Sequence, residues 1–283
     1  MNKLLYLSDD EVQSQLATKY NLLVHIGLET FRYAIIDTVH DQGKVLAEFE
    51  IPKVSNVAAL IKAIEDLPES SRQFKFSFNN VKISFDTSNY TFIPSDLYDE
   101  ENREEYGKYL GLTGSSELLV HSLPSAEIKN IVAIESELNK ALNRIFHKPR
   151  IYNQAAPFLE GVQRSLKREE DAVCFIDVQL RHFQVALFKD FKLEFYNSFE
   201  YANADEFNYY LLNIIESLNI NLEQTPITLS GQITKTDEVY QRIEKYFESI
   251  RFMDSDQLIK YSDKFEEVLP HTFFTLFSLD LCV

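Results

Sequence analysis

The sequence has little glycine and cysteine and lacks tryptophan: 283 residues contain 7 Gly, 2 Cys and no Trp. Scarce glycine argues against loops that hold phosphate groups, because such loops need positive φ angles and close backbone approach. Neither GxxxxGK[ST] nor GxGxxG occurs in the sequence. Cys174 and Cys282 stand in apolar surroundings and form no CxxC pair, so we expect two buried, reduced thiols.

Basic residues are also outnumbered. Asp and Glu total 44 against 28 Lys and Arg, which gives a formal net charge of -16. Such a surface repels phosphate backbones and anionic lipids, so we expect neither a nucleic-acid partner nor direct membrane insertion. No apolar run reaches the roughly 18 residues of a membrane span. Ser8 and Glu11 predict a capped short helix at the amino terminus instead of a signal peptide, and we therefore expect a cytoplasmic protein.

The hydrophobic content is 45%, with 22 Phe and 15 Tyr, and indicates a globular protein long enough for two modest domains. Several runs alternate like strands, and others have helical spacing. The predicted strands of the first half are 22–28, 31–37, 44–51, 73–78, 81–86 and 117–124. The predicted helices are 56–67 and 125–146, the latter from the spacing of Ile128, Ile131, Ile134, Leu138 and Leu142. We expect the apolar tail 271–283 to pack onto the second half.

The order of elements then repeats. Residues 171–188 again have the pattern strand, turn, strand, followed by a third strand at 192–201 and a helix that Asn203 and Glu206 open. An offset of 152 pairs His25 with Asp177 without a gap and also matches several apolar positions. We therefore predict an internal duplication, with a first subdomain at 1–153 and a second at 154–283.

A hairpin, a third strand and a crossover helix, twice in one chain, resemble the actin-like ATPase superfamily. The resemblance implies an α/β fold of two ribonuclease-H-like subdomains, each a mixed five-stranded sheet with flanking helices. In that superfamily a D-x-G hairpin of each half approaches the nucleotide phosphates, and a glycine-rich turn approaches the adenosine. The counterparts here are HIGLET (25–30), DVQLRH (177–182) and LSGQ (229–232).

The sequence also resembles a narrower group. The segments TFIPSDLYDEENREEY, IYNQAAPFLEG and FFTLFSLDLC are similar to an uncharacterised bacterial family of unknown function with this fold. That family is distantly similar to the cytoplasmic actin-like scaffolds of pilus assembly and type II secretion. The resemblance implies that the partner is another protein.

The resemblance further implies where a nucleotide site would lie, with ATP and magnesium as its cofactors. Asp177 is the candidate catalytic residue and the candidate metal ligand. The candidate nucleotide-binding residues are His25, Gly27, Glu29, Gln179, Arg181, His182, Ser230 and Gly231. Three departures weaken this site, and one of them is Ser230 with Gly231 in place of a glycine pair near the adenosine. Histidine replaces an acid at His25, although magnesium prefers oxygen ligands, and Gln179 brings a side chain where phosphate needs backbone amides.

Three functions remain open at this point. The first is a non-catalytic actin-like scaffold or interaction protein with degraded nucleotide-binding motifs. The second is an active magnesium-dependent ATPase or kinase that uses the cleft between the two halves, with Asp177 holding magnesium or orienting the attacking water. The third is a metal-dependent nuclease, for which Asp177, Asp37 and Glu200 are the carboxylates, although the acidity of the chain opposes it.

Each candidate also has a purely structural interpretation. Asp177 is equally compatible with a turn or strand-end aspartate that bonds to nearby backbone amides. His25 is compatible with a satisfied, partly buried histidine. Ser230 and Gly231 are compatible with a simple turn at the end of a strand.

Overall fold

The computed structural model describes residues 1–8, 12–51, 56–67, 73–110, 115–167, 171–255, 258–260, 265 and 268–283. Contacts divide the chain into two compact units. Unit 1 comprises Met1–Glu160, Asp256–Glu267 and Leu276–Val283, and unit 2 comprises Gly161–Ser255 and Val268–Thr275. These units are defined by contacts, whereas the division into 1–153 and 154–283 concerns a duplication, so that division stays a prediction.

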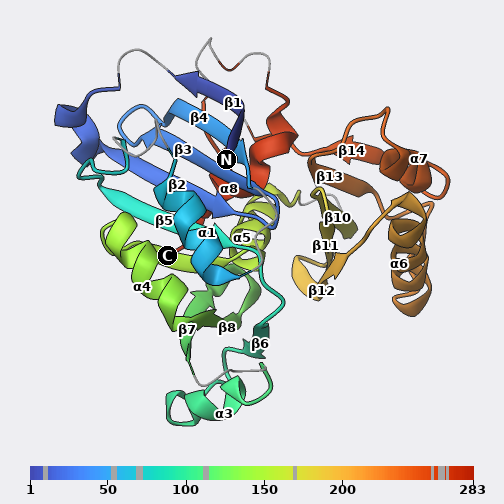
Figure 1. Ribbon diagram of the computed structural model, residues 1–283. Coiled ribbons are helices and arrows are strands. Elements are labelled where there is room, and N and C mark those ends of the chain that lie inside the picture. Colours follow the sequence, from blue (N-terminus) through green and yellow to red (C-terminus); the bar gives the residue numbers. More distant parts are fainter. Residues whose placement is uncertain are drawn as a thin grey trace. The chain divides into compact units, whose positions relative to one another are not determined.

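Unit 1 is built on a six-stranded mixed sheet with the strand order β1-β4-β3-β2-β5-β9 (Figure 1). Its strands are β1 (Asn2–Ser8), β2 (Tyr20–Ile26), β3 (Thr30–Asp37), β4 (Gln42–Glu50), β5 (Asn80–Phe85) and β9 (Arg150–Asn153). β1 pairs with β4, β4 with β3, and β3 with β2, all antiparallel. β5 and β9 continue the sheet in parallel with β2. Every residue of β2 is buried, which explains why apolar and polar residues do not alternate along it.

Two helices of unit 1 contribute to the same core as this sheet. Helix α1 (Val57–Glu65) begins after Asn56, whose side chain accepts a hydrogen bond from the Ala59 amide at 2.9 Å. It contributes Ile61 and Ile64 to the core, while α4 (Ser136–Ile145) contributes Leu138, Ala141 and Leu142. The apolar spacing of both helices therefore follows from burial of one face.

A separate three-stranded antiparallel sheet in unit 1 has the order β6-β8-β7 (Figure 1). Its strands are β6 (Tyr90–Pro94), β7 (Ser116–Leu123) and β8 (Ile128–Glu135). The short helices η2 (Glu100–Asn102) and α3 (Arg103–Gly107) lie between β6 and β7 in the chain. A small apolar cluster of Leu110, Leu118, Ile131 and Ala133 supports this part of the unit.

Three expectations about the first half are wrong. The predicted helix at 125–146 is the central strand β8 followed by α4, because residues 130–134 are buried in succession and an apolar run of that kind suits a covered strand as well as a helix. Ser8 ends β1 instead of opening a helix, and Glu11 lies outside the described residues. The run 73–78 forms no strand, although Phe74 does pack in the core.

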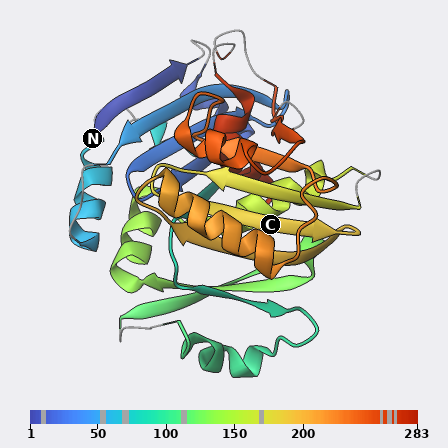
Figure 2. The same ribbon diagram turned by 90° about the vertical axis from the view of Figure 1, so that its right-hand side faces the viewer.

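Unit 2 is built on a five-stranded mixed sheet with the order β12-β11-β10-β13-β14. Its strands are β10 (Ala172–Val178), β11 (His182–Lys189), β12 (Lys192–Glu200), β13 (Ile227–Gly231) and β14 (Ile250–Phe252). Figure 2 shows α6 (Ala204–Ser217), in orange, lying across the yellow strands of this sheet. Phe207, Leu211 and Ile214 of α6 and Ile243 of α7 (Glu238–Glu244) join the strands in one apolar core.

The two sheets share one arrangement. The order β4-β3-β2-β5-β9 of unit 1 corresponds to β12-β11-β10-β13-β14 of unit 2, with the same parallel and antiparallel pairs, and β1 is an addition to the first. Both hairpins also share their register: Tyr20 pairs with Asp37, and Ala172 pairs with Lys189, each 152 residues later. This agreement supports the predicted duplication.

The carboxyl-terminal segment belongs largely to unit 1, so the expectation that all of 271–283 packs onto the second half is wrong. It contains η5 (Pro270–Phe273), α8 (Phe274–Ser278) and η6 (Leu279–Leu281). The Asn21 amide donates to Asp280 Oδ1 at 2.7 Å, and Lys82 Nζ donates to the Asp280 carbonyl at 2.5 Å. Burial lowers the pKa of Lys82, so Asp280 supplies the acceptors that this buried cation needs. Within the described residues, no helix has the length and apolarity to cross a membrane.

Candidate functional site

The predicted residues of unit 2 gather at the carboxyl end of β10, around the buried side chain of Asp177, which is 1% exposed. Its Oδ1 atom accepts hydrogen bonds from Ser230 Oγ at 2.8 Å and Thr275 Oγ1 at 3.1 Å. Its Oδ2 atom accepts from Gln179 Nε2 at 2.9 Å and Gln184 Nε2 at 3.2 Å. Side-chain donors of the same unit therefore surround this carboxylate and compensate its burial.

Strand β13 ends beside Asp177 at a glycine that no other residue can replace without movement. Gly231 has a φ of +88°, and a Cβ atom there would lie 2.1 Å from the Val178 carbonyl oxygen and 2.9 Å from Gln179 Nε2. The Gln232 amide donates to the same Val178 carbonyl at 2.6 Å. Gly231 thus serves a close approach of β13 to β10, and Gln179 occupies the space next to it.

The remaining predicted residues of unit 2 lie on the hairpin turn. The Gln179 amide donates to the His182 carbonyl at 2.8 Å, which closes the turn. Arg181 is exposed at its tip, whereas His182 is buried. Tyr201 Oη donates to the Gln179 carbonyl at 2.7 Å and fixes the backbone of the turn.

In unit 1 the equivalent hairpin has a different chemistry. His25 is 6% exposed, its Nδ1 atom lies 3.0 Å from Ser84 Oγ, and its Nε2 atom lies 3.5 Å from Asp86 Oδ1. The Gly27 amide donates to the Thr30 carbonyl at 2.7 Å and closes the turn, as the corresponding bond does in unit 2. Glu29, on the tip, contributes its carbonyl to a hydrogen bond from the Ile51 amide at 2.8 Å.

Two residues of this hairpin region, Ser84 and Asp86, are not among the predicted site residues. Ser84 pairs with His25 in the sheet as Ser230 pairs with Asp177, and Asp86 directly follows β5. The sequence does contain a signal for Asp86: an acid at the carboxyl end of a strand that runs parallel to β2 must lie near the end of β2. The distance of about sixty residues between His25 and Asp86 hides this relation from local patterns.

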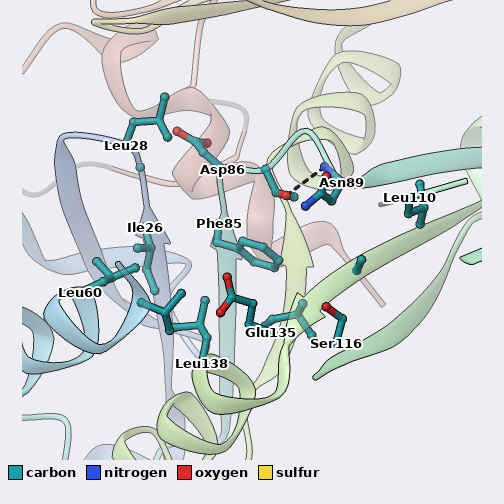
Figure 3. Close-up of a pocket in the computed structure, with 15 residues that line it drawn as sticks. Ile26, Leu28, Leu60, Phe85, Asp86, Asn89, Leu110, Ser116, Glu135 and Leu138 are labelled. Carbon is teal, nitrogen blue, oxygen red and sulfur yellow. Dashed lines mark hydrogen bonds between the residues drawn. The ribbon is translucent and has the colours of Figure 1, made fainter. Parts of the chain in front are cut away.

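A pocket of about 240 Å³ lies beside the Gly27 turn, within unit 1 (Figure 3). The turn, α1, the chain after β5, and the junction of β8 with α4 all contribute to it. Its lining residues are Ile26, Gly27, Leu28, Val57, Leu60, Phe85, Asp86, Thr87, Asn89, Leu110, Ser116, Ala133, Ile134, Glu135 and Leu138. Of the predicted site residues of unit 1, Gly27 lines this pocket, and His25 and Glu29 do not.

The pocket combines an apolar wall with negative charge. Asp86 and Glu135 line it, and its described lining includes no Lys, Arg or His. In Figure 3 the Asp86 carboxylate lies toward the Leu28 end and the Glu135 carboxylate toward the Leu138 end. Glu135 is exposed and makes no side-chain capping bond to α4. Such a cavity suits an apolar group that carries a positive charge beside it.

The other predicted carboxylates are not grouped around a common point within their units. Asp37 ends β3, opposite Tyr20 and hence at the far end of the hairpin from His25. Although burial raises the pKa of Asp37, hydrogen bonds from His40 and from the Val39 amide lower it overall. Glu200 pairs with His182 at the end of β12. Among the described residues, no group of three or more His, Cys, Asp and Glu side chains has a metal-binding arrangement.

Comparison with known sequences identifies one family. The profile of a family described as "Protein of unknown function (DUF3822)" matches residues 9–250. Curated proteins give no match by sequence.

Solved structures similar to this chain share its fold. A Bacteroides thetaiotaomicron protein, described as having an actin-like ATPase fold and unknown function, is 19% identical, with a TM-score of 0.79 over 96% of this chain and 99% of that one. A chain of the PilM–PilN type IV pilus biogenesis complex is 14% identical, with a TM-score of 0.66 over 92% and 97%. The ethanolamine utilization protein EutJ from Carboxydothermus hydrogenoformans is 7% identical, with a TM-score of 0.53 over 94% and 89%.

These similarities establish the architecture. The predicted α/β class and actin-like ATPase fold are confirmed, and so is the predicted resemblance to an uncharacterised family that is distantly similar to pilus scaffolds. At identities of this size the shared fold carries no information about activity. The function therefore has to be argued from the side chains of this chain.

Proposed function

We propose that this chain, which belongs to the DUF3822 family of proteins of unknown function, is a non-catalytic actin-like scaffold that works by binding another protein. The observation that carries the proposal is the environment of Asp177. Both carboxylate oxygens of this residue already accept two side-chain hydrogen bonds each, from Ser230, Thr275, Gln179 and Gln184.

A carboxylate in that environment is poorly suited to phosphoryl transfer. To hold magnesium or orient a water, Asp177 would have to give up hydrogen bonds from buried donors, and each donor left unsatisfied costs about 1–3 kcal/mol. The Tyr196 hydroxyl donates to Gln184 Oε1 at 2.7 Å and thereby fixes the Gln184 amide with its NH₂ toward Asp177. The network thus opposes the release of this side chain.

The unit 1 hairpin gives the proposal separate support. The first acid of the superfamily motif is absent, and the imidazole of His25 lies between Ser84 and Asp86. A neutral imidazole is a poor ligand for magnesium, which prefers oxygen. We therefore infer that both hairpins descend from one duplicated phosphate-binding element and that each has lost a different part of it.

The partner and the location are part of the same proposal. PilM, whose fold this chain shares, was solved in a complex with PilN, which supports a protein partner here. We also propose a cytoplasmic location, in line with two free, buried cysteines. Burial raises the pKa of Cys174 and of Cys282 to about 12, so both remain protonated thiols, as suits a structural role in a reducing compartment.

The competing function is a magnesium-dependent ATPase or kinase, and calorimetry decides between the two. Titration with ATP and magnesium is expected to give no binding heat, and ATP turnover is expected to stay at background in the wild type and in Asp177→Asn. Asp171→Asn is the matched control, because Asp171 is exposed at the start of the same strand region. Magnesium-dependent turnover that Asp177→Asn abolishes and Asp171→Asn leaves intact would overturn the proposal.

A further inference from the structure

We propose that the pocket beside the Gly27 turn of unit 1 is the docking site for a short segment of a partner protein. This segment places one large apolar side chain in the pocket and a lysine or arginine next to it. The inference rests on the proposed function, because it names the surface and the chemistry by which the scaffold binds its partner.

The size of the pocket favours a side chain over a free ligand. Small-molecule sites usually enclose about 300–1,000 Å³, whereas this pocket encloses about 240 Å³. A leucine, phenylalanine or tyrosine side chain fits such a volume, but a nucleotide does not. Ile26, Leu60, Phe85 and Leu138 supply an apolar wall of the kind that anchors one residue of a protein partner.

The charges of the lining determine what stands beside that anchor. Asp86 and Glu135 are both acidic, and the described lining includes no Lys, Arg or His. Asp86 lies against His25, with Oδ1 3.5 Å from Nε2, so the exposed Glu135 is the charge that a partner residue can reach. The chain as a whole carries a net charge of -16, so its long-range field also attracts a basic segment and repels an acidic one. A lysine or arginine next to the anchor gains from both effects, and Glu135 is exposed where such a residue would reach it.

An exposed apolar residue marks the edge of the pocket. Leu28, on the tip of the hairpin turn, lines the pocket and is 47% exposed. Its counterpart Leu180 occupies the same place on the hairpin of unit 2 and is 56% exposed, but it does not line this pocket. A segment that docks in the pocket covers Leu28, and the two leucines therefore form a natural pair of test and control positions.

The test uses the full chain and a phage library that displays random 12-residue peptides. We expect selection to enrich peptides with an aliphatic or aromatic residue next to Lys or Arg. Synthetic versions of these peptides are then titrated by fluorescence anisotropy. Binding should weaken as salt is raised, because one part of the attraction is electrostatic.

Two pairs of variants locate the site. Glu135→Lys should weaken peptide binding at least tenfold, while Glu137→Lys, which changes the charge equally in the exposed first turn of α4 but does not line the pocket, should change it less than twofold. Leu28→Ser should likewise weaken binding at least tenfold, and Leu180→Ser should not. All four positions are exposed, and the melting temperature of each variant verifies that it has folded.

Three outcomes overturn the inference: no peptide is enriched, the enriched peptides are acidic, or Glu135→Lys and Glu137→Lys bind equally well. Any of them leaves the scaffold proposal standing as long as ATP turnover stays at background. Conversely, magnesium-dependent turnover that depends on Asp177 overturns the scaffold proposal, whatever the peptides do. The two failures are therefore distinguishable.

Discussion

The hairpins of units 1 and 2 share their strand pairing but carry different side chains near the turn. Near the carboxyl end of the inner strand of each hairpin, one residue pairs with a serine on the parallel neighbouring strand. His25 pairs with Ser84, and Asp177 pairs with Ser230. The residues paired with them on the antiparallel strand differ. Arg32 pairs with His25 and forms a buried ion pair with Glu48 at 2.7 Å, whereas Gln184 pairs with Asp177 and donates a hydrogen bond to it.

The two hairpins differ in the space beside the turn. In unit 2 the side chain of Gln179 folds back onto Asp177, and the turn is filled. In unit 1 the corresponding residue is Gly27, which carries no side chain, and a pocket lies next to it. One backbone thus supports a closed polar network in one unit and an open apolar cavity in the other, so register and fold alone do not reveal which hairpin binds something.

The strongest test of this comparison uses Gly231, at the end of β13 beside Asp177, and Gly27, in the hairpin turn of unit 1. Gly231→Ala brings a Cβ atom within 2.1 Å of the Val178 carbonyl at a φ of +88°, and we expect a loss of about 4 kcal/mol in the free energy of unfolding. Gly27→Ala meets Thr30 Oγ1 at 3.0 Å, the Thr30 carbonyl oxygen at 3.2 Å and Asp86 Oδ2 at 3.3 Å. Small shifts relieve those contacts, so we expect a loss of about 1 kcal/mol. Urea unfolding measures both, and equal losses would contradict the distinction.

Acid unfolding separates a partly buried histidine of unit 1, His121, from a buried one of unit 2, His271. Burial lowers the pKa of His121 from 6.5 to about 4, despite a hydrogen bond with the Ile151 backbone that raises it. Between these values the unfolded chain binds a proton that the folded chain does not, so stability falls as the pH falls. The loss amounts to about 3 kcal/mol. Urea unfolding between pH 7 and 4 should show that His121→Gln removes this part of the pH dependence.

The matched variant in unit 2 is His271→Gln. Burial also lowers the pKa of His271, although the Ile233 carbonyl, 2.8 Å from Nε2, and the charge of Asp177 oppose the shift. We therefore expect a pH dependence of the same sign in unit 2, which His271→Gln reduces and His121→Gln leaves in place. If the free energy of unfolding of His121→Gln depended on pH as steeply as that of the wild type, the assignment of this pH dependence to His121 would be contradicted.

The sequence predicts the hairpins better than the elements between them. The offset of 152 between His25 and Asp177 reappears in the register, because a hairpin is local and its pairing follows from strand pattern and turn length. The sequence predicts a helix where β8 lies, because Ile128, Ile131 and Ile134 happen to have helical spacing in a strand that is buried between two neighbours. Only tertiary contacts separate these possibilities.

Some parts of the candidate site can likewise be predicted from the sequence, and others cannot. The cluster around Asp177 includes Gln179, two residues along the chain, and Ser230, which the resemblance to the actin-like superfamily indicates. It also includes Thr275, which lies far along the chain and has no local signal. The sequence does not predict the pocket, because its walls come from segments separated by up to about a hundred residues. Local chemistry is therefore readable from sequence, and a cavity is not.

The central acid of unit 2 should matter more for stability than the histidine at the same place in unit 1. Asp177→Asn turns one acceptor oxygen into an NH₂ group, and the amides of Gln179 and Gln184 then meet a donor. We expect a loss of about 2 kcal/mol, since a buried unsatisfied donor costs about 1–3 kcal/mol. His25→Gln keeps a polar partner for Ser84 and should lose under about 1 kcal/mol. Thermal unfolding compares the two, and a reversed order would contradict the network.

His25→Asp has a smaller effect at neutral pH, and it asks whether the unit 1 hairpin still tolerates the acid of the superfamily motif. The new carboxylate would lie close to Asp86, whose Oδ1 is now 3.5 Å from His25 Nε2, and Gly27 stands in the place of Gln179, one of the donors that surround Asp177. Repulsion raises the pKa of the pair, so the variant should lose about 1 kcal/mol at pH 7.

The sign of its pH dependence distinguishes this repulsion from a packing defect. A pair whose pKa is raised on folding is most stable below its unfolded value and loses stability as the pH rises through the folded one. The deficit of His25→Asp should therefore shrink from pH 8 to pH 4.5, while that of His25→Asn, which has the same shape and no charge, should not change. If millimolar magnesium stabilised His25→Asp but not His25→Asn, the backbone of this hairpin would still be able to hold a cation. The side chain at position 25 would then be what distinguishes it from a working phosphate-binding turn.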